Sequence, residues 1–85
     1  MGWLSDFEYP VLDFVRTHSL EECGTRQVVK GVLGREPNSV ELQSLARVLH
    51  RLAYERRLER VYPFKHSNGE PDHQKTCWKI GARRD

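Results

Sequence analysis

Residues 25–56 read TRQVVKGVLGREPNSVELQSLARVLHRLAYER, and the spacing of their apolar side chains predicts two helices joined by a tight polar turn. The first helix is expected at residues 26–33, and Gly34 follows it as a residue that ends helices in the left-handed conformation. The turn is the polar breaker REPN at residues 35–38. The second helix is expected at residues 40–56, with an apolar stripe formed by Leu42, Leu45, Val48, Leu49 and Leu52.

Another helix is expected before this pair, at residues 7–18. Its apolar residues recur at helical spacing: Phe7, Val11, Leu12, Phe14 and Val15. A residue of a type that caps helix N-termini stands before each predicted helix, namely Asp6, Thr25 and Ser39. The connector at residues 18–24 leaves open whether a short third strand lies between the first two helices.

The last third of the chain changes from helical spacing to strand-forming residues. Residues 58–64 read LERVYPF and residues 76–80 read TCWKI, which predicts a hairpin over residues 58–81. Trp78 and Ile80 are two residues apart, so both are expected to face the core. The polar loop at residues 65–75 has almost no apolar side chains and is expected to be mobile, because it buries too little surface to offset its ordering entropy.

The order of these elements in a chain of 85 residues predicts one domain of the α+β class, spanning residues 1–85 with a winged helix-turn-helix layout. Two stretches resemble winged-helix regulators. One is Leu49-x-x-Leu52 followed by Arg57-Leu58-Glu59-Arg60-Val61, and the other is Gly24-Thr25-Arg26-Gln27-Val28-Val29 at the start of the second helix. The resemblance covers about residues 20–81 and implies this fold, and with it the binding of duplex DNA.

The turn after the third helix departs from that family, in which a small residue, often glycine, stands there. Here Glu55-Arg56-Arg57 fills the turn, so one of these three residues is expected in the left-handed backbone conformation.

A narrower stretch, Leu49-His50-Arg51-Leu52-Ala53 with Trp78-Lys79-Ile80, resembles the Z-DNA-binding winged helices. That family uses an asparagine and a tyrosine on the third helix and a tryptophan near the wing. The matching helix positions here are Ala46 and His50, only Trp78 is kept, and the short proline-rich wing is absent. This second resemblance therefore implies shared architecture rather than recognition of left-handed DNA.

Cysteine and histidine usage predicts no catalytic residue, no metal ligand and no cofactor, and the chain is not expected to be an enzyme. Cys23 and Cys77 lie in no CxxC motif, and no HExxH motif is present, so two reduced thiols in a cytoplasmic protein are expected. A bridge between the cysteines, or a metal site that adds His66 and His73, are the alternatives. No signal peptide or membrane-spanning run is found in the sequence, so no membrane association is expected.

Charge is distributed unevenly along the chain. Residues 1–24 carry five acidic residues and one arginine, whereas residues 25–85 carry thirteen basic and seven acidic residues. The basic middle segment, residues 43–65, contains Arg47, Arg51, Arg56, Arg57, Arg60 and Lys65. Such a segment is typical of a surface that binds a polyanion, and equally of a solvated helix face laced with ion pairs.

In a helix-turn-helix, the N-terminal half of the second helix of the pair lies nearest the base edges. The candidate base-reading residues are therefore Ser39, Gln43, Ser44 and Arg47. Residues placed for phosphate contacts, or beside them on the same exposed side, are His50, Arg51, Tyr54, Arg56 and Arg57. In the hairpin loop, Lys65 and Lys75 are expected to reach the backbone, with His66 and Asn68 beside them.

The sequence thus favours a small winged-helix DNA-binding protein, a transcriptional regulator with double-stranded DNA as partner. Its expected location is the cytoplasm, in association with the nucleoid or nucleus where it binds DNA. The alternative is a winged-helix module for protein–protein interaction in a larger assembly. An aromatic-rich N-terminus formed by Trp3, Leu4, Phe7 and Tyr9 is expected either to complete the core or to contact a protein partner or a second copy of the chain.

Overall fold

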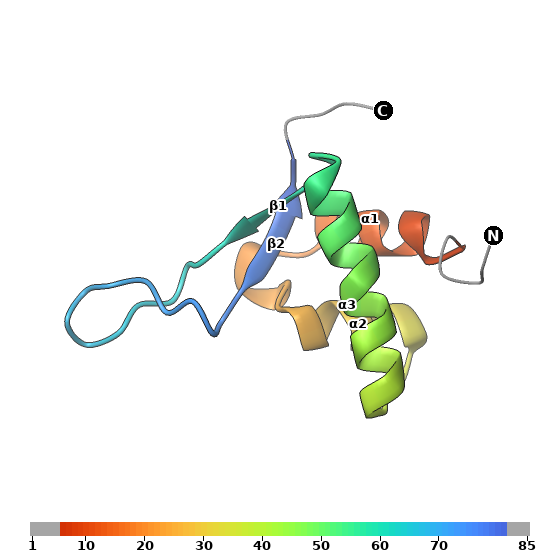
Figure 1. Ribbon diagram of the computed structural model, residues 1–85, viewed down its shortest axis with the longest axis horizontal. Helices are drawn as coiled ribbons and strands as arrows, with labels where there is room; N and C mark the ends of the chain where they lie inside the picture. Colours follow the sequence, from red (N-terminus) through yellow and green to blue (C-terminus); the bar gives the residue numbers. More distant parts are fainter. Residues whose placement is uncertain (1–5, 82–85) are drawn as a thin grey trace.

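The computed structural model describes residues 6–81 and confirms the α+β arrangement: three helices followed by a two-stranded antiparallel hairpin, the topology of a winged helix (Figure 1). The elements are α1 (Glu8–Thr17), the 3₁₀ helix η2 (Leu20–Glu22), α2 (Thr25–Leu33), α3 (Ser39–Tyr54), β1 (Leu58–Val61) and β2 (Cys77–Ile80). Each α-helix begins and ends within two residues of its predicted bounds. None of the helices in residues 6–81 combines the length and apolar character needed to cross a membrane.

The residues that cap the helices differ from those predicted. Asn38, not Ser39, caps α3: its side chain accepts a hydrogen bond from the Glu41 N–H at 2.8 Å, and its own N–H donates to the Glu41 carboxylate at 3.0 Å. This reciprocal pair satisfies two backbone donors at once. Gly24 rather than Thr25 precedes α2, and Phe7 rather than Asp6 precedes α1, without a side-chain cap.

Two turns require left-handed backbone. Gly34 ends α2 with a φ of 76°, as predicted. After α3, Arg56 has a φ of 65° and is the one residue besides glycine with positive φ in residues 6–81, which confirms the expectation for this turn. Left-handed backbone strains a side chain that carries a Cβ.

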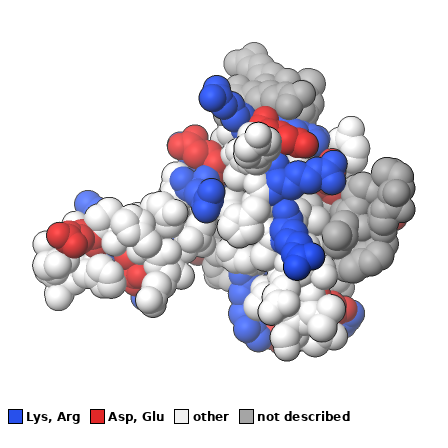
Figure 2. Space-filling model, viewed as in Figure 1, with Lys and Arg blue, Asp and Glu red and all other residues white. Residues whose placement is uncertain are grey.

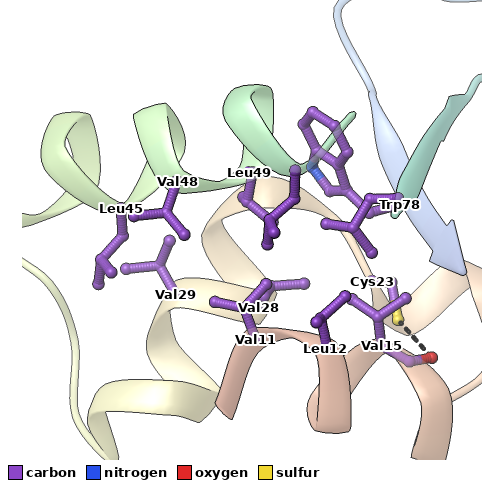
Figure 3. Close-up of a cluster of buried hydrophobic side chains, with 12 residues drawn as sticks. Val11, Leu12, Val15, Cys23, Val28, Val29, Leu45, Val48, Leu49 and Trp78 are labelled. Atoms are coloured by element: carbon purple, nitrogen blue, oxygen red, sulfur yellow. Dashed lines mark hydrogen bonds between the residues drawn. The ribbon is translucent and has the colours of Figure 1, made fainter. Parts of the chain in front are cut away.

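The core lies between the three helices and the sheet (Figure 3). Figure 3 shows apolar side chains of α3 facing those of α1 and α2, with the Trp78 indole closing one end. The buried cluster consists of Val11, Leu12, Val15, Cys23, Val28, Val29, Leu45, Val48, Leu49, Leu52, Leu58 and Trp78. All five members of the predicted α3 stripe are in this cluster or, for Leu42, packed against it.

The sheet pairs Leu58 with Ile80 and Val61 with Cys77. A single further bridge joins Gly24 to Cys77, and the Trp78 N–H donates to the Cys23 carbonyl at 2.9 Å. The connector between α1 and α2 thus contributes an isolated bridge and not a third strand. Cys77 is therefore flanked on both sides and buried.

The prediction that Trp78 and Ile80 both face the core was wrong for Ile80, which is 43% exposed. Ile80 shares a face with Trp78 and Leu58, but it is the last residue of its strand.

The wing hairpin, which we define as residues 62–76, projects from the body as an arm (Figure 1). Its two legs are joined by a bridge between Lys65 and Pro71 and by an N–H of Asp72 that donates to the Phe64 carbonyl at 2.9 Å. Gly69 turns the tip with a φ of 88°. The backbone pairing therefore continues beyond β1 and β2, and mobility of the loop stays a prediction.

Candidate nucleic-acid interface

The solvent-facing side of α3 brings most of the predicted site residues together. Ser39, Gln43, Arg47, His50, Arg51 and Tyr54 are exposed along it, and Ser44 is half-buried. Figure 2 shows basic side chains following the course of α3 across this face. The helical stripe that buries Leu45, Leu49 and Leu52 on the other side fixes this orientation.

The first turns of α3 carry little free charge. The one acidic residue there, Glu41, is bound by Arg35 in a close ion pair, with a second contact between Arg35 Nη1 and Glu41 Oε1 of 2.8 Å. The hydrogen bonds from Arg35, followed by that from the Asn38 N–H, lower the pKa of Glu41 to about 2. Uncharged polar side chains, Ser39, Gln43 and Ser44, are thus left beside Arg47.

Two of the arginines predicted to bind phosphate instead form ion pairs with acidic residues. Glu8 of α1 lies 3.1 Å from Arg51 and 3.2 Å from Arg57, and Glu55 lies 3.5 Å from Arg51. The side chains of Arg57 and Glu8 are only 15% and 16% exposed. Arg57 therefore ties α1 to the turn after α3, whereas Arg51 remains 60% exposed beside the helix.

Other arginines near α3 have no acidic partner. Within residues 6–81, neither Arg47, Arg56 nor Arg60 forms an ion pair. Arg60 was missed as a site residue. It lies opposite Trp78 in the sheet and so shares the inner face of the hairpin, while its neighbour Glu59 pairs with Lys79 on the other face, at 3.9 Å. Predicting the direction of Arg60 would have required the pairing register of the two strands, which the sequence analysis did not assign.

Trp78 lies in the core beneath the exposed side of α3 and contacts both α2 and α3. It is 1% exposed, and its indole Nε1–H donates to the Thr25 hydroxyl at 2.9 Å. The imidazole of His50 meets the indole edge-on, with ring centroids 5.5 Å apart. Trp78 is therefore a core residue that packs against His50, and His50 itself remains exposed.

The wing brings Lys65 and Lys75 to solvent but does not make a basic arm. Lys75 lies over the Phe64 ring, 5.7 Å from its centroid. Glu70 and Asp72 lie in the same hairpin, so residues 62–76 carry two basic and two acidic residues. With neutral histidines the wing has no net charge.

Comparisons with protein-family models, with curated proteins and with solved structures found no match for this chain. Function is therefore inferred from the geometry of α3, β1 and the wing.

A groove of about 500 Å³ separates the wing from the first turn of α2. Leu42 and Phe64 contribute apolar side chains to it, and Thr25, Gln27 and Lys75 contribute polar ones. The Thr25 hydroxyl accepts from Trp78, so its own hydrogen is left to donate. Through Leu42 the groove also borders the first turns of α3.

Both cysteines are buried free thiols, as predicted, and burial raises the pKa of each. No group of three or more His, Cys, Asp or Glu side chains that could hold a metal ion occurs in the part of the chain that the structure describes.

The N-terminal aromatic segment is divided. Trp3 and Leu4 lie outside the described residues. Phe7 packs against the core, and Tyr9 is 78% exposed on α1. Tyr9 alone among the described residues of this segment is presented to solvent.

Proposed function

We propose that this protein is a winged-helix DNA-binding protein that regulates transcription, reading duplex DNA with α3 while nearby arginines and the wing contact the backbone. The observation that carries the proposal is the division of the exposed side of α3. Its first turns present uncharged polar groups, and unpaired arginines follow at Arg47, at Arg56 and, from the adjacent strand, at Arg60.

This division suits the two kinds of contact that a DNA-binding helix makes. Base edges in the major groove are read by hydrogen-bonding side chains such as glutamine and arginine, and phosphates attract cations without regard to sequence. The major groove, about 12 Å wide, admits an α-helix such as α3. In this arrangement Gln43 and Arg47 reach bases, while Arg56 and Arg60 lie near phosphates.

The test compares Arg47→Ala with Arg16→Ala, a matched loss of one positive charge from the exposed face of α1. Binding to a mixed duplex is measured by fluorescence anisotropy at several salt concentrations. We expect wild-type binding to weaken steeply with salt, and Arg47→Ala to lose about 1–3 kcal/mol of specific binding. Arg16→Ala should bind as the wild type does. Equal affinities of the two variants, both folded by circular dichroism, would exclude α3 as the reader.

A second function, a protein-interaction module, is favoured by one observation. The wing has no net charge and therefore gives a polyanion no net attraction, while Tyr54 and Tyr9 are 91% and 78% exposed. The same titration separates the two functions, since an interaction module should show no salt-dependent binding of duplex DNA.

A further inference from the structure

One aliphatic side chain stands out on the exposed side of α3. Val40 is 71% exposed, whereas every other valine within residues 6–81 is buried or half-buried. Valine is also a modest helix former, because its branched side chain is restricted by the preceding turn. Neither burial in the core nor helix propensity therefore explains valine at this position.

The surroundings of Val40 are polar but nearly uncharged. Gln43 and Ser44 lie three and four residues further along the helix, which places them next to Val40 on the same side. The neighbouring carboxylate of Glu41 is held by Arg35 and by the N–H of Asn38. No free charge thus lies beside the two methyl groups of Val40 in the first turn of the helix.

The major groove offers one apolar group for such a side chain. Among the four bases, only thymine carries a methyl group there, at C5, and adenine opposite presents the N6 and N7 atoms that a glutamine can bind together. An apolar side chain next to a glutamine is therefore the chemistry that recognises a thymine with an adenine close by.

Resting on the DNA binding proposed above, we propose that Val40 is a specificity-determining residue that contacts the C5 methyl group of a thymine. Gln43, one helical turn away, then reads an adenine at the same or the adjacent base pair. The substrate class is duplex DNA with an A·T pair where the first turn of α3 enters the major groove.

The test uses deoxyuridine, which pairs with adenine as thymine does and lacks only the methyl group. A duplex selected by the wild-type protein from a random pool is made once with thymine and once with deoxyuridine throughout. Removing one buried methyl group should weaken wild-type binding about fourfold. Val40→Ala should bind the thymine duplex more weakly than the wild type does and should bind the two duplexes equally. Alanine is the stronger helix former, so loss of the helix does not explain that result.

Tyr9→Ala is the control, because it removes an exposed apolar side chain from α1 and should keep the fourfold preference for thymine. Equal wild-type binding of the two duplexes would overturn the inference and leave the DNA binding in place. A preference that survives in Val40→Ala would also overturn it, since another residue would then read the methyl group. Absence of selectable binding to any duplex would overturn the proposed function together with the inference.

Discussion

Replacing Arg57 tests most directly whether an arginine near α3 stabilises the fold or contacts DNA. Its guanidinium lies 3.2 Å from Glu8, and both side chains are about one-sixth exposed. Removing one partner of a buried pair costs about 3–5 kcal/mol, whereas an exposed pair contributes about 0–1 kcal/mol. Glu8 keeps a second partner in Arg51 at 3.1 Å, which lowers the cost. We therefore expect Arg57→Ala to destabilise the protein by about 2 kcal/mol.

Urea unfolding followed by circular dichroism measures this change. For a chain this small the free energy of unfolding falls by about 1 kcal/mol per molar urea, so the midpoint should move down by about 2 M. Arg16→Ala is the matched control, because its pair with Asp13 is 68% and 64% exposed and should contribute less than about 0.5 kcal/mol. The reasoning is refuted if Arg57→Ala unfolds at the wild-type urea concentration and lowers the salt dependence of DNA binding as Arg47→Ala does.

Two further predictions concern the ends of α3. Because the pKa of Glu41 is about 2 in the folded protein and its ordinary value is 4.5, its contribution to stability is complete above pH 4.5 and is lost as the pH falls toward 2. Arg35→Ala should flatten that part of the stability–pH curve, measured as thermal midpoints between pH 2 and 6. Arg56→Gly should increase the free energy of unfolding by up to about 1 kcal/mol and so raise the thermal midpoint, because glycine adopts the φ of 65° without strain. A lower midpoint for Arg56→Gly would show that the Arg56 side chain stabilises the turn.

The helices could be predicted from the sequence because their signals are local. The apolar spacing of α3 and the glycine after α2 depend on neighbouring residues only, and the structure confirms both. The cap at Asn38 could also have been found, since Asn38 and Glu41 stand at the spacing of a reciprocal cap. The prediction instead placed Asn38 in the turn and named Ser39, which is also a capping type of residue, as the cap.

The site was harder to predict, because it depends on contacts between distant parts of the chain. Arg57 was assigned to phosphates from its charge, yet its partner Glu8 lies 49 residues earlier. Arg60 was not assigned because its direction follows from the pairing with Trp78 in β2. The burial of Cys77 likewise required the bridge to Gly24, which local alternation does not show.

In the structure, the arginines of the basic middle segment fall into two groups, those with an acidic partner and those without one in residues 6–81. Glu8, from the acidic first part of the chain, and Glu55 together balance the charges of Arg51 and Arg57. The interpretation as an ion-paired helix face therefore holds for Arg51 and Arg57, and the polyanion-binding surface stays a proposal for the remaining cations. Near α3 and the wing the cations without an ion pair within residues 6–81 are Arg47, Arg56, Arg60, Lys65 and Lys75.

This division bounds the salt dependence of DNA binding. If each of those five cations displaces one counterion from DNA, Arg47 from within the groove and the other four at phosphates, log K should fall with log salt with a slope of about −4 to −5. Replacing Lys65 and Lys75 together by alanine should reduce the slope by up to about two for every duplex tested, since phosphate contacts carry no sequence preference. A wild-type slope steeper than about −6 would contradict the division, because it would require Arg51 and Arg57 to leave Glu8 and bind phosphate as well.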